Sequence, residues 1–230
     1  MQKRGEKDPS AAEPAEPAPK SRAERRREDT RRRLMKATYE IIASRGLAGL
    51  VIQDITEAAD VGYGSFYNHF TSKDAIVNAV IEAARDHTRQ IFRRLASTTS
   101  DQVEIFALEL RASLQLSKAD KTWGWFTIRT ALSGEEPDSG IGRELRLSLD
   151  ECLKSGAFSE GDREMAQEIT DGLLLIGTLK LLTGEVSETY PDKLVRTILK
   201  HLGLSEAKIR SVFLQPPPDP DLQPFLEAAR

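Results

Sequence analysis

Cysteine is almost absent from this sequence, since Cys152 is the only one among 230 residues. A single cysteine cannot form an internal disulfide, so the chain is expected in a reducing compartment, the cytoplasm. Long hydrophobic runs are missing as well. No apolar stretch reaches the length of about 18 residues that a membrane-spanning helix needs. The first residues are charged and contain no apolar stretch, so they do not resemble a secretory signal.

Groups of residues with the spacing of a catalytic or metal site are also lacking. His69, His87 and His201 are far apart, and none has a second metal ligand three or four residues away. Gly62 and Gly64 lack the third glycine and the preceding strand of a dinucleotide-binding loop. No carboxylate pair, Ser/His/Asp set or phosphate loop follows residue 100. The sequence therefore predicts no enzyme, no metal site and no cofactor.

An alternating strand pattern is absent too, and the apolar residues recur at the period of about 3.6 that is typical of helices. The predicted fold class is therefore all-α. Residues 1–28 begin with a Pro-, Ala- and Glu-rich segment and are expected to form a disordered tail. Residues 214–230 contain the run PPPDPDLQP and are expected to form a second, extended tail.

Charge is divided unevenly along the chain. Residues 1–95 carry 18 Lys and Arg against 14 Asp and Glu, whereas residues 96–230 carry 15 against 22. Residues 20–33 alone hold eight basic and three acidic side chains. This pattern favours a polyanion-binding N-terminal part joined to a body with another role. The basic run is interpreted either as an arm that lies on a DNA backbone or as a solvated extension of the first helix.

Three closely spaced helices are predicted ahead of a long one. The first carries an apolar stripe and ends at Gly46, a residue typical of helix C-termini. The second carries Ile52 and Ile55 over about two turns. A short third helix lies in the segment ADVGYGSFYNHFTSKD, residues 59–74. Thr71 and Asp74 then have the spacing of a capping box and open a long helix over residues 73–95.

The short third helix has two different faces. Phe66 and Phe70, one turn apart, are predicted to point into the core. The opposite face carries Tyr63, Gly64, Tyr67 and Asn68, with Ser65 and His69 beside them. Such hydroxyl, amide and imidazole groups suit hydrogen bonds to phosphates and base edges in a major groove. A short exposed helix after another helix is the geometry of a helix-turn-helix. Partial burial of Tyr67 is the alternative interpretation.

The segment from about residue 34 to residue 80 resembles the DNA-binding domain of the tetracycline-repressor (TetR) family of bacterial transcription regulators. The similarity rests on ATYEIIASRG (37–46), DITEAADV (54–61) and above all SFYNHFTSKDAI (65–76). Three positions depart from the family pattern. Val51 replaces a capping Thr or Ser, Asp60 replaces a turn glycine, and Gly62 replaces a capping Ser or Thr. Asp tolerates left-handed geometry and Gly is an acceptable N-cap, so only a phosphate contact at Val51 is in doubt.

The resemblance implies roles for individual residues. Base contacts are expected from Tyr63, Gly64 and Asn68. Phosphate contacts are expected from Gln53, Ser65, Tyr67, His69 and Lys73. Packing against the next helix is the alternative for His69. Residues 29–75 would form the helix-turn-helix domain, and residues 76–213 a helical domain for effector binding and dimerisation.

Further helices are expected at about 101–118, 122–133, 139–155, 162–183, 191–203 and 205–213. The resemblance implies that 162–183 and 191–203 form a homodimer interface, with core packing as the alternative. The expected interface residues are Ile169, Gly172, Leu173, Ile176, Gly177, Leu194 and Ile198. It also implies a ligand pocket near the aromatic segment, with Trp123, Trp125, Phe126 and Arg129 as the candidate lining; here too core packing is the alternative.

The resemblance as a whole implies a cytoplasmic, homodimeric repressor that binds a palindromic duplex DNA operator and is released by an unknown small molecule. No membrane partner is implied. Two other classes of function stay open. One is a constitutive DNA-binding protein without an effector, and the other is an all-α small-molecule-binding protein or enzyme.

Overall fold

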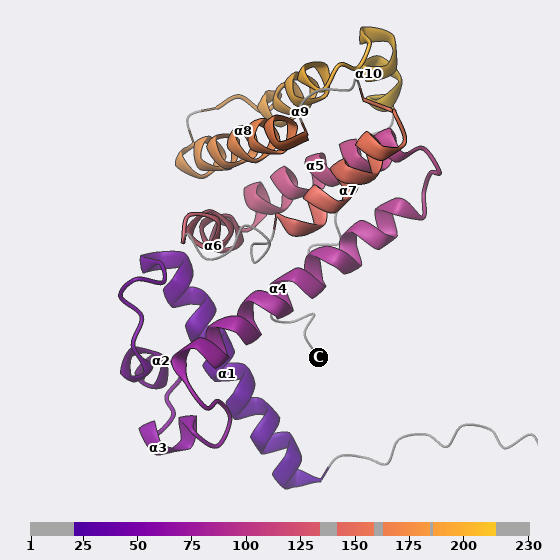
Figure 1. Cartoon of the computed structure of the whole chain (residues 1–230). Coiled ribbons are helices and arrows are strands. Elements are labelled where there is room, and N and C mark those ends of the chain that lie inside the picture. Colours follow the sequence, from indigo (N-terminus) through magenta and orange to yellow (C-terminus); the bar gives the residue numbers. More distant parts are fainter. Residues whose placement is uncertain (1–20, 134–141, 159–162, 185, 215–230) are drawn as a thin grey trace, which may run out of the picture.

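The computed structural model describes residues 21–133, 142–158, 163–184 and 186–214, and within these ranges it is helical, without a strand. This confirms the predicted all-α fold class. The helices are α1 (Arg22–Arg45), α2 (Ile52–Ala58), α3 (Tyr63–Phe66), α4 (Lys73–Ala96), α5 (Gln102–Ala119), α6 (Lys121–Ala131), α7 (Arg143–Lys154), α8 (Arg163–Thr183), α9 (Tyr190–His201) and α10 (Glu206–Val212). In Figure 1, α1 to α3 gather at one end and α4 leads diagonally toward the remaining helices.

The first helix begins earlier than expected. Ser21 caps it by accepting from the Glu24 backbone N–H, while the Glu24 carboxylate accepts from Ser21 N at 2.7 Å. This reciprocal pair satisfies two N–H groups that a helix start otherwise leaves open. The expected disordered tail over residues 1–28 is therefore wrong for residues 22–28, whereas residues 1–20 lie outside the described residues. The basic run is mostly helix and continues α1, while contact of its arginines with DNA stays a prediction.

The core of the N-terminal unit confirms the apolar pattern. Leu34 and Ile42 of α1, Ile55 of α2 and Phe66 of α3 are fully buried together with Ile76 of α4. The turns also follow the sequence. Gly46 ends α1 with φ of 80°, and Asp60 adopts φ of 51° between α2 and α3. One cap differs: Ser72, not Thr71, accepts from Ala75 N at 3.1 Å and opens α4.

The C-terminal part is built around α5. This helix packs against α6, α7, α8 and α9, and α4 covers part of α5 and α7. Figure 1 shows α6 lying between α1 and the α8–α9 pair, so α6 joins the two parts of the molecule. Cys152 of α7 is buried there, with the pKa of its thiol raised to about 12 by burial. Within the described ranges, no helix has the length and apolar character needed to cross a bilayer.

One buried acid lies between α5 and α7. Glu109 of α5 is 5% exposed, and its Oε2 atom has no hydrogen-bond partner among the described residues. Burial raises the pKa of its carboxyl to about 7, against the opposing effect of a hydrogen bond from Ser148. The folded chain therefore keeps a proton on Glu109 at pH values where the unfolded chain, with a pKa near 4.5, has lost it.

This acid makes stability depend on pH. The contribution of protonated Glu109 to the free energy of unfolding is fully present below about pH 4.5 and is lost as pH rises through about 7. A shift of this size corresponds to roughly 3 kcal/mol. At pH 8 we expect Glu109→Gln to raise the free energy of unfolding by about 2–3 kcal/mol relative to the native chain. At pH 4.5 the variant and the native chain should have the same free energy of unfolding. Urea titrations at several pH values measure this. Glu104→Gln, on the same helix but less buried, is the control, and an equal response of both variants would contradict the assignment.

Candidate DNA-binding surface and ligand cavity

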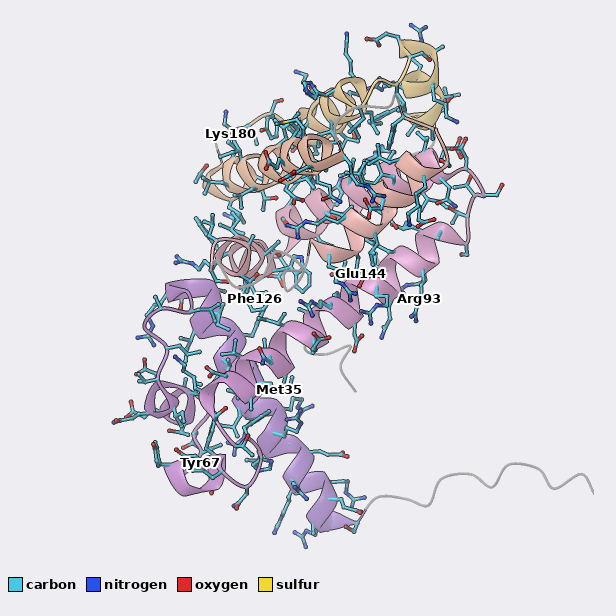
Figure 2. All side chains as sticks on the ribbon, viewed as in Figure 1. Met35, Tyr67, Arg93, Phe126, Glu144 and Lys180 are labelled. Carbon is cyan, nitrogen blue, oxygen red and sulfur yellow. The ribbon has the colours of Figure 1, made fainter. Side chains whose placement is uncertain are left out.

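The third helix presents the predicted face to solvent. It starts after Gly62, and its buried anchor Phe66 packs on Phe70 with ring centroids 5.9 Å apart. On the other side Tyr63 and Tyr67 are 53% and 50% exposed, and their hydroxyls lie 3.3 Å apart. Figure 2 shows Tyr67 at the end of the molecule that is remote from Lys180 of α8. Both tyrosine rings thus keep an exposed face for a partner, and Tyr67 also packs edge-on against Phe66 with ring centroids 5.4 Å apart, so the alternative of partial burial stays open.

The remaining candidates for base contact lie on the same surface. Asn68 is exposed, and a Cβ added at Gly64 would meet nothing within 4 Å. The absence of a side chain at Gly64 leaves open backbone beside two tyrosines. The structure therefore brings Tyr63, Gly64 and Asn68 together, as the sequence predicted, in a form that can approach base edges.

The candidate phosphate contacts surround this face. Ser65 is half-buried, and Lys73 stands at the first residue of α4, where free backbone N–H groups also favour an anion. Gln53 donates to Glu57 within α2 at 2.8 Å, which leaves the second N–H of its amide for a phosphate. His69 is half-buried, and burial together with Arg27 and Arg31 lowers the pKa of its imidazole. It therefore offers a neutral N–H donor at neutral pH, without a full charge.

Three arginines of α1 reach the same region, and the residue assignments above omitted them. Arg27 donates to the Asn68 carbonyl at 3.5 Å, and Arg31 lies 4.4 Å above the Phe70 ring. Arg33 donates to the Asp60 carbonyl at 3.3 Å. The basic run is visible in the sequence. Which of its arginines face α2 and α3 depends on how far the first helix extends into the run. These contacts place positive charge along the edge of the α3 surface.

A cavity of about 250 Å³ lies in the C-terminal part, between α4, α5, α6, α7 and α8. Its lining combines apolar and hydroxyl-bearing side chains. The residues are Thr88, Phe92, Ser113, Leu116, Ser117, Trp123, Thr127, Ile128, Thr130, Ala131, Gly142, Leu145, Arg146, Asp171, Gly172, Leu174, Leu175 and Thr178. Such a partly open, mainly apolar space with convergent polar groups is typical of a small-molecule site.

The cavity corrects the predicted pocket. Of the four candidates, Trp123 lines it, whereas Trp125, Phe126 and Arg129 do not. Phe126 is fully buried against Tyr39 of α1, with ring centroids 4.9 Å apart, and Figure 2 shows it between α6 and α1. Arg129 donates to the Ala43 carbonyl at 3.0 Å and covers the Trp125 ring. The candidates separate because α6 has two faces. Trp123 lies on the face toward the cavity, whereas Phe126 and Arg129 lie on the face that α1 covers.

The expected dimer residues also divide into two sets. Gly177, Leu194 and Ile198 are buried inside the single chain, where α8 packs on α9. They cannot meet a partner without unfolding this contact, so their assignment is corrected. Ile169 and Leu173 are partly exposed and Ile176 is exposed on the outer side of α8, whereas the exposed Gly172 also borders the cavity. The outward residues Lys193, Thr197, Lys200 and His201 of α9 are polar.

Comparison with known families gives two matches along the chain. Residues 34–80 match the family model described as bacterial regulatory proteins, tetR family. Residues 101–214 match a tetracyclin repressor-like C-terminal domain. The first match covers the three-helix unit with the exposed α3 face. The second covers the helices that enclose the cavity together with α4.

Curated relatives match over about a third of the chain. The HTH-type transcriptional repressor DhaR of Mycobacterium sp. (strain GP1) is 37% identical over 75 residues, which are 33% of this chain and 36% of that protein. KstR2 of Rhodococcus jostii (strain RHA1), also an HTH-type transcriptional repressor, is 30% identical over 71 residues, or 31% of this chain and 35% of that protein. The matches therefore span about a third of each curated relative.

Solved structures match over a longer range. RolR in complex with the ligand resorcinol is 27% identical, with a TM-score of 0.61, and the alignment covers 86% of this chain and all of RolR. FadR from Bacillus subtilis in complex with stearoyl-CoA has a TM-score of 0.54 over 75% of this chain and 98% of FadR. Its identity is 21%, so this second likeness concerns the fold alone.

Proposed function

The chain belongs to the tetR family of bacterial regulatory proteins, and from this premise we propose that it is a sequence-specific, DNA-binding transcription regulator. In this proposal it acts in the cytoplasm as a homodimeric repressor, and a small molecule in the cavity lowers its affinity for the operator. It binds and does not catalyse. The observation that carries the proposal is the exposed α3 face with its flanking arginines.

DNA recognition would use this face in a major groove. Tyr63, Gly64 and Asn68 are the base-contacting candidates, and Ser65, Tyr67, His69, Lys73 and Gln53 those for phosphates. The α1 arginines add positive charge along the same edge. This charge would raise the affinity for DNA through the release of counterions, without reading bases. Two copies of α3 must enter grooves about 34–36 Å apart, or a multiple of that distance, so the operator is expected to be palindromic.

The two classes of contact respond differently to substitution. Selection of bound duplexes from a random pool first identifies the operator. We then expect Asn68→Ala to reduce discrimination at particular base pairs, by about 1–3 kcal/mol per site. Lys73→Ala should weaken binding to all duplexes and reduce the salt slope by about one unit. Equilibrium binding at several salt concentrations measures both.

Asn78→Ala is the matched control, because Asn78 is an exposed asparagine on α4 outside the α3 segment. It should leave selectivity unchanged. Equal losses of Asn68→Ala on operator and random DNA would contradict base reading by Asn68. Failure of the native chain to select any sequence would contradict the proposed function itself.

Dimerisation is proposed through the outer side of α8. Met165 and Ile176 are large apolar residues that are 49% and 51% exposed, and Ile169, Gly172 and Leu173 lie between them at helical spacing. An apolar stripe of this kind on a helix surface favours a second copy of the same helix. In this proposal the outer side of α9, which is polar, lies outside this contact.

Two helices connect the cavity to the DNA-binding unit. On α7, Leu145 and Arg146 line the cavity while the neighbouring Glu144 accepts from Arg89 of α4 at 3.0 Å; Figure 2 shows Glu144 close to α4. On α6, Thr127 faces the cavity while Phe126 packs on α1. A ligand that displaces either helix would shift α4 or α1 and so the separation of the two α3 helices.

Binding of a small molecule by this chain is supported by its likeness to RolR, whose structure was solved in complex with the ligand resorcinol. A tenfold loss of operator affinity needs only about 1.4 kcal/mol of coupling between the two sites. The competing proposal is a constitutive DNA-binding protein. It predicts that no compound bound in the cavity changes the affinity for the operator.

A further inference from the structure

Hydroxyl groups form most of the polar lining of the cavity, and most of them already donate a hydrogen bond within the protein. Six lining residues bear a hydroxyl, namely Thr88, Ser113, Ser117, Thr127, Thr130 and Thr178. Five of them donate to the carbonyl one turn earlier in their own helix. These bonds are Thr88 to Ala84 at 3.1 Å, Ser113 to Glu109 at 2.9 Å, Ser117 to Ser113 at 3.0 Å, Thr127 to Trp123 at 2.9 Å and Thr130 to Phe126 at 2.8 Å.

A hydroxyl has one proton and two acceptor lone pairs. When the proton is held by a backbone carbonyl, the group can only accept a hydrogen bond from a molecule in the cavity. Five of the six hydroxyls are in this state, so the lining consists mainly of acceptors. A bound molecule must therefore supply the protons, because an acceptor group placed against these oxygens would be buried without a partner.

The charged groups of the lining compensate each other. Arg146 Nε lies 2.8 Å from Asp171 Oδ2, so the guanidinium is paired with a carboxylate of the same cavity. An anionic ligand would add a second negative charge beside Asp171, which already compensates the charge of Arg146, and would meet acceptor oxygens elsewhere. Asp171 itself adds another acceptor. The lining therefore disfavours carboxylates and favours a molecule without net charge.

The size of the cavity further limits the class of ligand that it can hold. Its volume of about 250 Å³ lies above that of a cavity of about 150 Å³ that binds benzene, and below the range of about 300–1,000 Å³ for drug-sized ligands. One ring with a few substituents fits this volume. Phe92 and Trp123 supply aromatic walls for such a ring.

We propose that the cavity binds uncharged, single-ring compounds that carry two or more hydrogen-bond donors, such as dihydroxylated aromatics, and that it excludes carboxylates and long acyl chains. The inference deepens the proposed function, since it names the chemistry of the ligand in the regulatory cavity. It does not depend on DNA, because binding to the cavity is measured on the protein alone.

The first experiment compares three probes of nearly equal size on the full-length native chain. Resorcinol has two O–H donors, 1,3-dimethoxybenzene has the same ring with acceptors only, and benzoate carries a negative charge. Calorimetry and the tryptophan emission of the chain, to which Trp123 in the cavity and Trp125 outside it both contribute, report binding. We expect resorcinol to bind at least about tenfold more tightly than either of the others, the effect of about one lost hydrogen bond. Equal or tighter binding of dimethoxybenzene or benzoate, or no binding of resorcinol, would overturn the proposal.

The second experiment removes single acceptors. Ser117→Ala and Thr127→Val delete one hydroxyl each, and Thr197→Val is the matched control, because Thr197 makes the same bond to Lys193 at 2.9 Å on the exposed side of α9. At least one cavity variant should weaken resorcinol binding about tenfold with no change for dimethoxybenzene. If both cavity variants bind resorcinol like the native chain, acceptor recognition is refuted.

Operator binding is measured separately in the same preparations. Loss of DNA selection with the probe preference intact would contradict the proposed regulator and leave the ligand class standing. If the chain selects DNA but does not show the probe preference, the proposed regulator stands and the proposed ligand class is contradicted. The probe comparison on the native chain needs no variant to fold.

Discussion

Gly177→Arg is expected to disrupt the packing of α8 on α9 within one subunit. A Cβ at this position would lie well inside the 3.0 Å that real Cβ atoms keep from other atoms, against the Leu194 side chain, with the Tyr190 hydroxyl 3.7 Å away. A methyl group needs only a rotation of Leu194, but the long charged side chain of arginine has no exit. We expect the free energy of unfolding to fall by at least about 3 kcal/mol, from overpacking and a buried unpaired charge.

Thermal unfolding monitored by circular dichroism measures this loss, which corresponds to a midpoint lower by roughly 6–12 °C in a domain of this size. Glu168→Arg is the control, because Glu168 is exposed on the same helix and lies on a different side from Gly177. Its stability should change by no more than about 0.5 kcal/mol. A Gly177→Arg protein with native stability that merely becomes monomeric would support an interface at Gly177 and contradict the packing described here.

Ile176→Arg is expected to separate the dimer without unfolding the subunit. Ile176 adjoins Gly177 in sequence but points outward and is 51% exposed, so a charged side chain there is solvated in the monomer. In a dimer formed through α8 the same charge would be buried at the contact. Since two linked half-sites bind DNA far more tightly than one, we expect operator affinity to fall by about 100-fold or more.

Sedimentation velocity and operator titration on the same sample test this expectation. Thr197→Arg places an identical charge on the exposed, polar side of α9 and is the matched control. It should remain dimeric. A monomeric Thr197→Arg protein beside a dimeric Ile176→Arg protein would move the interface from α8 to α9.

Features with a local cause could be predicted from the sequence. Leu34, Ile42 and Ile55 recur at helical spacing, and all are buried. Gly46 and Asp60 occupy positive φ where the sequence placed a helix end and a left-handed turn. The aromatic segment around Phe66 places its exposed face on one side of a single short helix. In each case the determining contacts lie within a few residues, so spacing and residue type were sufficient.

The cavity and the dimer surface could not be predicted in this way. Helical period identifies the residues that share a face, but it does not say which other helix covers that face. Phe126 and Trp123 both looked like pocket residues, and only the packing of α1 on α6 separates them. Gly177 and Gly172 looked equivalent on α8, and only the position of α9 makes one of them a close contact.

The sequence by itself thus determined the all-α fold class, the end of the first helix at Gly46, the core of the N-terminal unit and the residues of the α3 face, since these depend on short-range spacing and sterics. The tertiary structure alone decided which face of α6 lines the cavity, where the basic run of α1 rests and which side of α8 is left for a partner. It also decided that burial raises the pKa of the Glu109 carboxyl to about 7. These properties arise from residues distant in sequence that share the same space, and from the water that their contact excludes.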